Sequence, residues 1–291
     1  MCLVSFLVPV KNEQSYICDA IDSLLAITTI EYEVLFVDDG STDDTVALIE
    51  SYDDPRIKCF LGGGKGKVAA LNLAYEQSSG QFFILFAGDD ILCPDVVVDR
   101  IAPFAAVDMA AISLCKVRMF SLDERYNNII IPKSPGRGAS TGGGMAFNKK
   151  FADCIFPIPD GLPNEDTWIK AFVDFGFCKV FHVPLVGLNY RIHSGNSIRR
   201  DVDFHKFSNQ LHVRERANKL FEERHAFGLS LRSRRLLRQR CSAQDDRYHG
   251  RWIKIFFYFS LPLKERVSLI FYSNSVFYYF RQRFYSFFSG R

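Results

Sequence analysis

Pairs of charged side chains stand next to apolar segments of this sequence, where they could bind a ligand. The apolar run 82–87 (FFILFA) is followed by Gly88, Asp89 and Asp90. Two carboxylates at the end of a buried strand are costly unless they pair, accept hydrogen bonds or bind a cation. In open α/β sheets, ligands bind outside the carboxyl ends of the strands. The sequence therefore predicts that Asp89 and Asp90 form the floor of a site, although Gly-Asp-Asp is also common in plain turns.

Three further pairs could complete such a site. Asp38 and Asp39 end a second apolar run, Glu165 and Asp166 begin a predicted helix, and Arg191 and His193 follow a late strand. A nucleoside diphosphate needs such a set, because carboxylates bind ribose hydroxyls while a divalent cation and Lys or Arg bind phosphates. Mg²⁺ or Mn²⁺ is typically held by one or two carboxylates and the phosphates of the substrate, a role that suits Asp89.

Each pair also has an alternative that involves no ligand. Segment 38–41 could be a turn and a helix cap, and Glu165 with Asp166 could simply favour a helix N-terminus. A lone His193 is more often structural than a ligand. The segment 62–67 (GGGKGK) could be a hinge, since it lacks the G-x-x-x-x-G-K-[ST] pattern of a P-loop. The order of the pairs and their joint placement at strand ends favour the functional interpretation.

Alternating strand and helix patterns would position these groups. Continuous apolar runs predict buried strands, and apolar residues at helical spacing predict the helices between them. The predicted strands are 3–10, 33–37, 57–61, 82–87, 109–120 and 177–188, and the predicted helices are 16–25, a short one after 41–42, 68–77, 94–104 and 164–175. The alternation through the first ninety residues indicates βαβ units and a parallel sheet. Residues 121–144 are polar and glycine-rich, and we expect a loop over the site.

The composition bounds the class of protein. The chain has 291 residues and is 48% hydrophobic, which indicates one large core or one domain with an appendage. The eight cysteines form no C-x-x-C pair, so we expect reduced core residues of a cytoplasmic protein. The apolar N-terminus has no basic region or cleavage site, and it predicts a first strand in preference to a signal peptide.

The last third of the chain has a different charge. Residues 201–291 hold 18 Lys and Arg against 8 Asp and Glu, whereas residues 1–200 hold 18 against 25. Two aromatic-rich blocks, 252–263 and 267–280, are flanked by Arg and Lys, and neither reaches the roughly 20 apolar residues of a spanning helix. They could lie on an anionic membrane surface, or form a helical appendage whose aromatics pack on the domain. No recognition motif accompanies the Arg-rich segment 212–240, so we expect no nucleic-acid partner.

Six segments in order resemble the inverting nucleotide-sugar glycosyltransferases of family 2, which have the GT-A fold. They are SFLVPVKNEQSYICDAIDSLL, EVLFVDDGSTDDT, GKGKVAALNLAYEQSSGQFFILFAGDD, GGGMAF, NEDTW and YRIHSGNS. The resemblance covers roughly residues 3–200. It implies a Rossmann-like α/β domain over 1–202, with a mostly parallel central sheet flanked by helices. Within it we expect a nucleotide-binding half (1–105) and an acceptor half (106–202), followed by a basic, aromatic-rich helical region over 203–291.

The resemblance also implies roles for individual residues. It makes Asp166 the general base, with Glu165 beside it, and assigns Asp89 and His193 to a Mn²⁺ or Mg²⁺ ion. The residues that it places at the nucleotide-sugar donor are Pro9, Asn12, Asp38, Asp39, Lys67, Asn72, Asp90 and Arg191. Two positions depart from the family pattern: Ala87 replaces the first carboxylate of the D-x-D motif, and Lys11 stands where an aromatic residue is common.

The activity implied by the resemblance is metal-dependent transfer of a sugar, with inversion, from a UDP-sugar to an acceptor hydroxyl. The acceptor would be a glycan or a lipid-linked sugar in O-antigen, capsule, exopolysaccharide or glycolipid assembly. The basic C-terminal region would hold the protein on the inner face of the cytoplasmic membrane. The alternative function is a catalytically inactive sugar-nucleotide-binding or scaffold protein, which the missing carboxylate at Ala87 favours.

Overall fold

The computed structural model describes residues 3–121, 123–124, 127–193 and 203–283. The chain divides into two compact units, Met1–Asn196 and Ser197–Arg291, and each has its own hydrophobic core. The expected domain boundary at 202/203 borders residues 194–202, which lie outside the described residues. That boundary and the subdivision at 105/106 therefore stay predictions.

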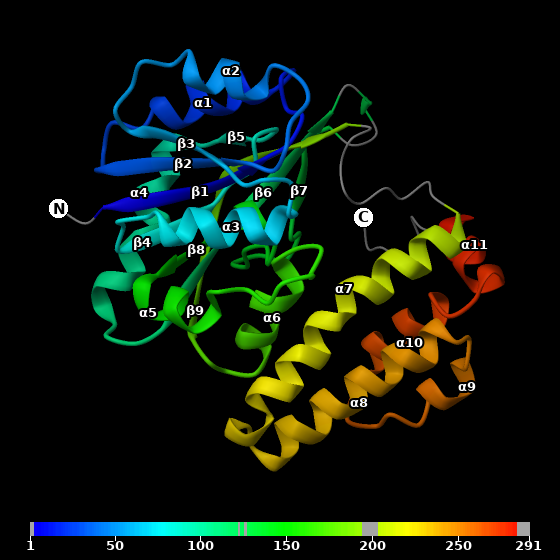
Figure 1. The fold of residues 1–291 in the computed structure, drawn as a ribbon. Coiled ribbons are helices and arrows are strands. Elements are labelled where there is room, and N and C mark those ends of the chain that lie inside the picture. The colour runs from blue at the N-terminus through cyan, green and yellow to red at the C-terminus, as the bar shows by residue number, and fades with distance from the viewer. Residues whose placement is uncertain (1–2, 122, 125–126, 194–202, 284–291) are drawn as a thin grey trace. The chain divides into compact units, whose positions relative to one another are not determined.

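One sheet forms the centre of the first unit, and nine strands of the described residues belong to it (Figure 1). The strands are β1 (Val4–Val10), β2 (Tyr32–Asp38), β3 (Ile57–Leu61), β4 (Phe82–Leu85), β5 (Ile91–Leu92), β6 (Ala111–Ser121), β7 (Ile129–Ile131), β8 (Met145–Asn148) and β9 (Lys179–Ile192). Their order is β3-β2-β1-β4-β8-β6-β9-β5, and β7 pairs with β6. The part from β3 to β4 is parallel, and the rest is mixed. The expected α/β fold is thus observed, but the sheet is mixed and not mostly parallel, because four of its strand pairings are antiparallel and β6 and β9 form a further parallel pair.

The parallel strands bring the polar segments to one edge of the sheet. In the register, Val10 of β1 lies opposite Asp38 of β2, and Asp38 lies opposite Leu61 of β3. Because parallel strands run in the same direction, the loops that follow these three strands meet at their carboxyl ends. The first unit therefore presents Lys11, Asp39 and the glycine-rich segment 62–66 at the same edge.

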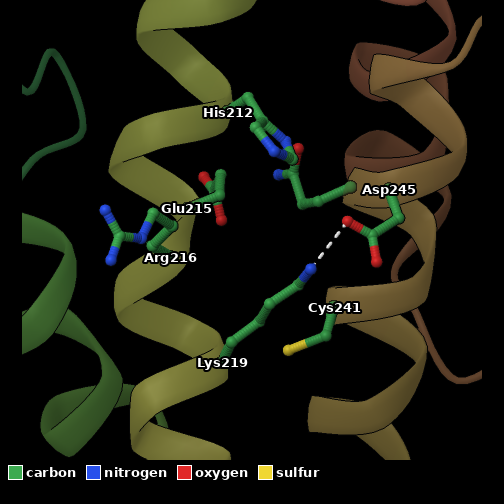
Figure 2. Close-up of a pocket in the computed structure, with 7 residues that line it drawn as sticks. His212, Glu215, Arg216, Lys219, Cys241 and Asp245 are labelled. Atoms are coloured by element: carbon green, nitrogen blue, oxygen red, sulfur yellow. Dashed lines mark hydrogen bonds and ion pairs between the residues drawn. The ribbon is translucent and has the colours of Figure 1, made fainter.

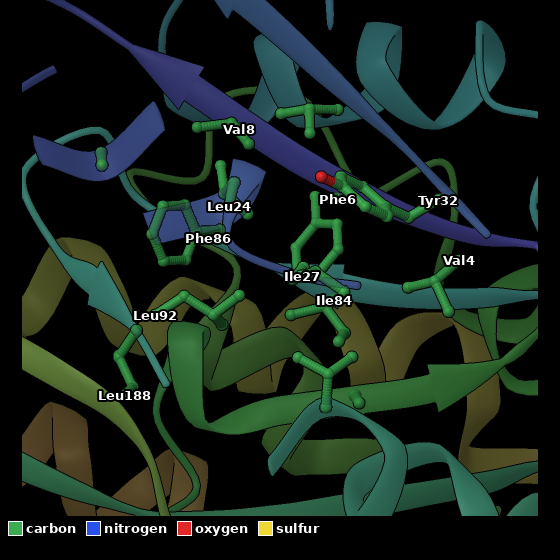
Figure 3. Close-up of a cluster of buried hydrophobic side chains, with 14 of the residues drawn as sticks. Val4, Phe6, Val8, Leu24, Ile27, Tyr32, Ile84, Phe86, Leu92 and Leu188 are labelled. Atoms are coloured by element: carbon green, nitrogen blue, oxygen red, sulfur yellow. The ribbon is translucent and has the colours of Figure 1, made fainter. Parts of the chain in front are cut away.

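Helices connect the strands and cover the sheet. In the first unit they are α1 (Ile17–Leu25), α2 (Thr45–Glu50), α3 (Lys67–Glu76), α4 (Val97–Ile101), α5 (Lys149–Ile155) and α6 (Asp166–Asp174). Alternate residues of β1, such as Phe6 and Val8, pack in one cluster with Leu24 of α1 and with Ile84 and Phe86 (Figure 3). The period of two in the strand and of about four in the helix creates the matching apolar faces.

The structure corrects three local expectations. The helix predicted over 94–104 is interrupted: α4 is only five residues long, between the 3₁₀ turns Pro94–Val96 and Ala102–Ala106. The loop expected at 121–144 contains β7, because three consecutive isoleucines pair with β6. The last strand continues past Pro184, and a register shift against Cys115 and Lys116 accommodates the residue that has no N–H group.

The second unit is helical, as expected. Its helices are α7 (Phe204–His225), α8 (Leu231–Tyr248), α9 (Trp252–Ile255), α10 (Leu263–Phe271) and α11 (Ser275–Arg283). Asp203 caps α7 by accepting the N–H groups of His205 and Lys206. Among the residues that the structure describes, no helix combines the length and the apolar character that crossing a membrane requires.

We predict that Gly138→Ala destabilises the first unit by about 1–3 kcal/mol, the usual cost of overpacking. A Cβ atom at Gly138 would lie 1.8 Å from the carbonyl oxygen of Leu114, which belongs to the backbone of β6 and cannot move aside. Urea unfolding measures the effect. Gly228→Ala is the control, because a Cβ atom there meets nothing within 4 Å. Equal stability of the Gly138 variant and the wild type would contradict the close packing of this segment on β6.

Candidate active site

The loops after β1 and β2 are hydrogen-bonded to each other. Pro9, near the end of β1, lies opposite Val37, and Asn12 follows in the left-handed region with a φ of 56°. The Asn12 N–H donates to Ser41 Oγ at 2.9 Å, and Asn12 Oδ1 accepts the Thr42 N–H at 2.8 Å. Pro9 and Asn12 therefore shape the turn beside the second loop, and their predicted place at the donor stays a prediction.

The two aspartates at the end of β2 fix the neighbouring loops. The Asp38 carboxylate accepts the N–H groups of residues 40–41, so it supports its own turn. Asp39 is buried, and its Oδ1 accepts the Gly66 N–H at 2.7 Å. Its Oδ2 lies 3.9 Å from Lys11 Nζ. Asp39 thus determines where the glycine-rich segment ends and where α3 begins.

A buried ion pair joins α3 to the start of α6. Lys67 Nζ lies 3.0 Å from Glu165 Oε1, and the Lys67 side chain is 44% exposed whereas that of Glu165 is 2% exposed. Burial alone would raise the pKa of Glu165, but the attraction of Lys67 outweighs it and the pKa is lowered. Glu165 Oε2 has no hydrogen-bond partner within the described part of the chain. A Cβ atom at Gly142 would lie 2.7 Å from Oε1, so only glycine fits beside this carboxylate.

Several predicted site residues converge around one tyrosine of β9. Burial raises the pKa of Tyr190 to about 12, and the carboxylates of Asp90, Asp89 and Asp166 add to the shift. Lys67 acts on the same hydroxyl in the opposite direction. The fold therefore brings together four charged residues from three distant parts of the chain. The sequence interpretation did not include Tyr190, although it directly precedes Arg191.

The Gly-Asp-Asp turn is held by the end of β9. Asp89 Oδ2 lies 2.9 Å from His193 Nε2, and the Asp89 carbonyl oxygen accepts a hydrogen bond from Arg191 Nε at 2.8 Å. Asp90 Oδ1 accepts the Arg191 N–H at 3.0 Å. Burial, and then repulsion by Asp89, raises the pKa of Asp90 well above its ordinary value. Asp90 is thus a buried part of the floor of the site, and Asp89 and His193 are its paired polar groups.

Arg191 packs between two rings. Its guanidinium lies 4.8 Å from the ring centroid of Tyr16 and 4.7 Å from that of Phe120. Nη2 also lies 2.8 Å from Asp19 Oδ2 of α1. These contacts fix Arg191 as a residue that positions Asp89. Its predicted contact with the donor stays a prediction.

Asp89 and His193 are the candidate ligands of a metal ion. Within the described ranges, no cluster of three or more His, Cys, Asp or Glu side chains is arranged to hold a metal ion. Asp89 and His193 provide one carboxylate and one imidazole, a combination that suits Mn²⁺. Protein sites for such ions commonly supply one or two ligands and leave the others to water and substrate phosphates. The pair therefore fits an ion that the protein and a diphosphate hold together.

Glu13 is a site residue that the sequence interpretation missed. Burial, followed by repulsion from Asp89 and Asp43, raises the pKa of Glu13 from 4.5 to about 8. A Cβ atom at Gly88 would lie 3.4 Å from Glu13 Cγ, which shows how closely the loop after β1 approaches the Gly-Asp-Asp turn. The signal was present, because Glu13 follows a buried strand as Asp38 and Asp39 do.

Asn72 is engaged elsewhere. Its Nδ2 donates to the carbonyl oxygen of Ile158 at 2.9 Å, and its Oδ1 accepts the Ile158 N–H at 2.8 Å. These bonds anchor the segment before α6 to α3. The predicted place of Asn72 at the donor stays a prediction.

A small pocket in the second unit offers no comparable chemistry. It lies between α7 and α8 and is lined by His212, Glu215, Arg216, Lys219, Cys241, Gln244 and Asp245 (Figure 2). Two of its charged groups, Lys219 Nζ and Asp245 Oδ1, pair with each other at 2.9 Å, and Glu215 accepts a hydrogen bond from Asn218. The edge of the sheet in the first unit is therefore the candidate active site.

The first unit resembles a known protein family. The model of the family described as Glycosyl transferase family 2 matches residues 5–157, slightly more than half of the chain. These residues include the loops after β1 and β2, the ion-pairing Lys67 and the Gly-Asp-Asp turn.

Curated relatives are glycosyltransferases as well. An uncharacterized glycosyltransferase of Rickettsia bellii is 28% identical over 210 residues, which are 66% of this chain and 30% of the relative. The chondroitin synthase of Escherichia coli is 35% identical over 97 residues, 33% of this chain and 14% of that protein. The chain spans about three-tenths of the length of the first curated relatives that it matches.

A solved structure shares the fold. Residues 1–349 of TarS from S. aureus, in complex with UDP-GlcNAc, superpose with a TM-score of 0.58 at 17% identity, covering 100% of this chain and 93% of that chain. The likeness confirms the expected GT-A arrangement of a mixed α/β sheet followed by C-terminal helices.

We predict that Glu13→Gln stabilises the protein and that the gain grows with pH. The pKa of Glu13 is about 8 in the folded protein and 4.5 ordinarily, so the stability present below pH 4.5 is lost as the pH rises through 8. Glutamine does not ionise and should keep that stability. Thermal unfolding between pH 5 and 9, with a chelator present, should show that the difference in Tm between the variant and the wild type increases with pH. Glu76→Gln, at an exposed position, is the control. A constant difference across this range would show that Glu13 is not the titrating group.

Proposed function

The chain belongs to glycosyl transferase family 2, and from this we propose that it transfers a sugar from a UDP-sugar to an acceptor hydroxyl with inversion. The observation that carries the proposal is the pair of Lys67 and Glu165 at 3.0 Å, directly before Asp166, together with the pair of Asp89 and His193 at 2.9 Å. A site with cationic, metal-binding and basic groups in reach of each other is what displacement of a nucleoside diphosphate requires. The UDP-GlcNAc complex of TarS supports UDP as the nucleotide.

The donor would lie along the edge formed by the first two loops. Asp39 Oδ2, which lies 3.9 Å from Lys11 Nζ, would accept a hydrogen bond from the edge of the base. Asn12 and Asp38 keep this loop pair in shape through their backbone hydrogen bonds. Lys11, which stands in place of an aromatic residue, could contact a phosphate instead of stacking on the base.

The diphosphate would lie between Asp89 and Lys67. Asp89 and His193 would hold a Mn²⁺ or Mg²⁺ ion, which supplies neutralisation of the charge that develops on the leaving phosphate. Lys67, whose side chain is 44% exposed and whose ammonium group pairs with Glu165, would contribute a further positive charge near the diphosphate. Arg191 keeps the Gly-Asp-Asp turn in place through the Asp89 carbonyl oxygen.

Asp166 is the proposed general base. It would take the proton of the acceptor hydroxyl while that oxygen forms a bond to the anomeric carbon. The bond from the anomeric carbon to the phosphate oxygen breaks, its electron pair leaves with the nucleoside diphosphate, and the configuration inverts. Glu165, which is held by Lys67, directly precedes Asp166 and fixes the start of α6. Proton transfer would occur late, because a carboxylate at a helix N-terminus is a weak base.

The second candidate function is sugar-nucleotide binding without turnover. Ala87 favours it, because the first carboxylate of the family motif is missing. The retention of Asp89, Asp166 and His193 in one protein favours the enzyme.

The pathway and location are part of the same proposal. The chondroitin synthase relative supports a role in polysaccharide or glycolipid assembly, with a glycan or lipid-linked sugar as acceptor. The basic C-terminal region would bring the enzyme to the inner face of the cytoplasmic membrane, where lipid-linked acceptors are available.

We predict that Asp89→Asn and Asp166→Asn fail in different ways. Purified protein is screened for binding and slow hydrolysis of UDP-, dTDP- and GDP-sugars, with and without Mn²⁺. Asp89→Asn should lose the Mn²⁺-dependent part of donor binding, measured by calorimetry. Asp166→Asn should still bind the donor but should hydrolyse it at least about 100-fold more slowly, which is the usual contribution of a general base.

Asp99→Asn, an exposed aspartate of α4, is the matched control and should behave as the wild type. Donor binding by the wild type without any hydrolysis or transfer would favour the binding protein over the enzyme. Absence of binding to every donor would reject both.

A further inference from the structure

Exposed apolar side chains concentrate in one part of the second unit. Of the nineteen large hydrophobic side chains that are exposed in the described residues, ten lie within 252–280. Phe257, Phe259, Leu263 and Val276 are each more than 60% exposed. Soluble surfaces rarely expose contiguous apolar patches of this kind without a partner.

Ring contacts connect five aromatic side chains in this part of the chain. Trp252 contacts Phe277 with ring centroids 5.7 Å apart, and Phe271 contacts both Phe277 and Phe280 at 6.4 Å. Trp252 also lies 6.3 Å from Phe256. The chain of contacts links α9, α10 and α11, and we name the exposed face of residues 252–283 the aromatic surface.

An arginine joins the remaining rings to it. Phe257 and Phe259 contact each other at 6.3 Å, and the Arg266 guanidinium lies 5.5 Å from the Phe259 ring. Arg266 Nη1 donates to the carbonyl oxygen of Phe256 at 2.7 Å. The segment between α9 and α10 is therefore fixed with its phenylalanines outward.

The charge of the segment that carries the aromatic surface is mainly positive, although Arg251 pairs with Asp246 of α8 at 2.5 Å. Residues 251–283 contain six Lys and Arg and one acid, Glu265. Arg240 Nε lies 2.7 Å from the Glu265 carboxylate, which compensates that single negative charge. Lys254 and Lys264 are exposed in the same segment. Aromatic side chains in a basic surround match an anionic phospholipid bilayer, whose interface takes up the rings while its headgroups attract the cations.

We infer that the aromatic surface binds an anionic membrane by inserting Phe257, Phe259 and Trp252 at the headgroup level. The surface is carried by α9, which has four residues, and by α10 and α11, which have nine each. Because a spanning helix needs about 20 residues, these helices would lie at the membrane interface. The inference deepens the proposed location at a membrane, and it is independent of the sugar transfer.

Vesicle binding tests the inference with the full chain. The protein should float with vesicles of phosphatidylglycerol and phosphatidylcholine, and much less with phosphatidylcholine alone. The double variant Phe257→Ser/Phe259→Ser should bind these vesicles at least about tenfold more weakly than the wild type. Lys254→Glu/Lys264→Glu should lose about tenfold at low salt and show a weaker salt dependence. Met109→Ser/Leu185→Ser and Lys133→Glu/Lys179→Glu, exposed in the first unit, are matched controls.

Tryptophan fluorescence provides a second measurement that needs no destabilising change. The chain has two tryptophans: Trp252 on the aromatic surface and Trp168, which is 1% exposed in the core of the first unit. Vesicles with brominated acyl chains should quench the wild type, and Trp252→Phe should abolish the quenching. Trp168 should stay unquenched in that variant.

Three results would overturn the inference. They are no binding to anionic vesicles, vesicle binding that the surface variants leave unchanged, and self-association in solution that Phe257→Ser/Phe259→Ser disrupts. Donor hydrolysis in buffer separates this inference from the proposed function, because the surface variants should hydrolyse the donor as the wild type does. If vesicle binding is absent but hydrolysis is intact, the membrane inference is wrong and the proposed enzyme activity is supported. If hydrolysis is absent but vesicle binding is intact, the proposed activity is wrong and the membrane inference is supported.

Discussion

The buried carboxylate of Glu165 is the charge on which the arrangement of the candidate site depends. A carboxylate that is 2% exposed costs several kcal/mol unless a cation compensates it, and Lys67 is that cation. Lys67 reaches it only because Asp39 fixes the Gly66 N–H, which sets the first residue of α3. Glu165 in turn immediately precedes α6, whose first residue is Asp166. One ion pair therefore connects the nucleotide-side loops to the proposed base, and its geometry is set from both ends by hydrogen-bonded backbone.

A second constraint acts at the Gly-Asp-Asp turn, where two carboxylates are adjacent in a buried place. Repulsion from Asp89 helps to raise the pKa of Asp90, so the pair carries less negative charge than two ionised groups would. The end of β9 stabilises the negative charge that remains on the two aspartates, because Arg191 donates hydrogen bonds to both residues and His193 lies against Asp89. The rings of Tyr16 and Phe120 keep the guanidinium where it is needed. The turn and β9 thus depend on each other, although about a hundred residues separate them.

The sequence predicts structure that depends on neighbouring residues, and it does not predict contacts between distant parts of the chain. Apolar runs gave the strands, because burial on both faces removes alternation, and acids after those runs marked the edge of the sheet. Fold class and the positions of Asp39 and Asp89 followed from this. The bond of Asn72 to Ile158 and the pair of Lys67 with Glu165 were beyond reach, since neither spacing nor composition encodes contacts across 86 and 98 residues. The break of the helix around α4, the strand β7 and the path of β9 past Pro184 depend on tertiary pairing that overrides local preference.

The balance of charge at the site gives a physical reason to expect a divalent cation with the donor. Glu13, Asp89, Asp90 and the pair of Glu165 and Asp166 surround a place that, in the proposed function, receives a polyanionic diphosphate. Lys67 is already committed to Glu165, and Arg191 to Asp19 and the Asp89 carbonyl oxygen. Like charges at such distances repel strongly where burial lowers the dielectric response. In the proposed function, a divalent ion bound with the nucleotide-sugar would offset the two negative charges of the diphosphate, so the donor would add no net negative charge to this acidic edge.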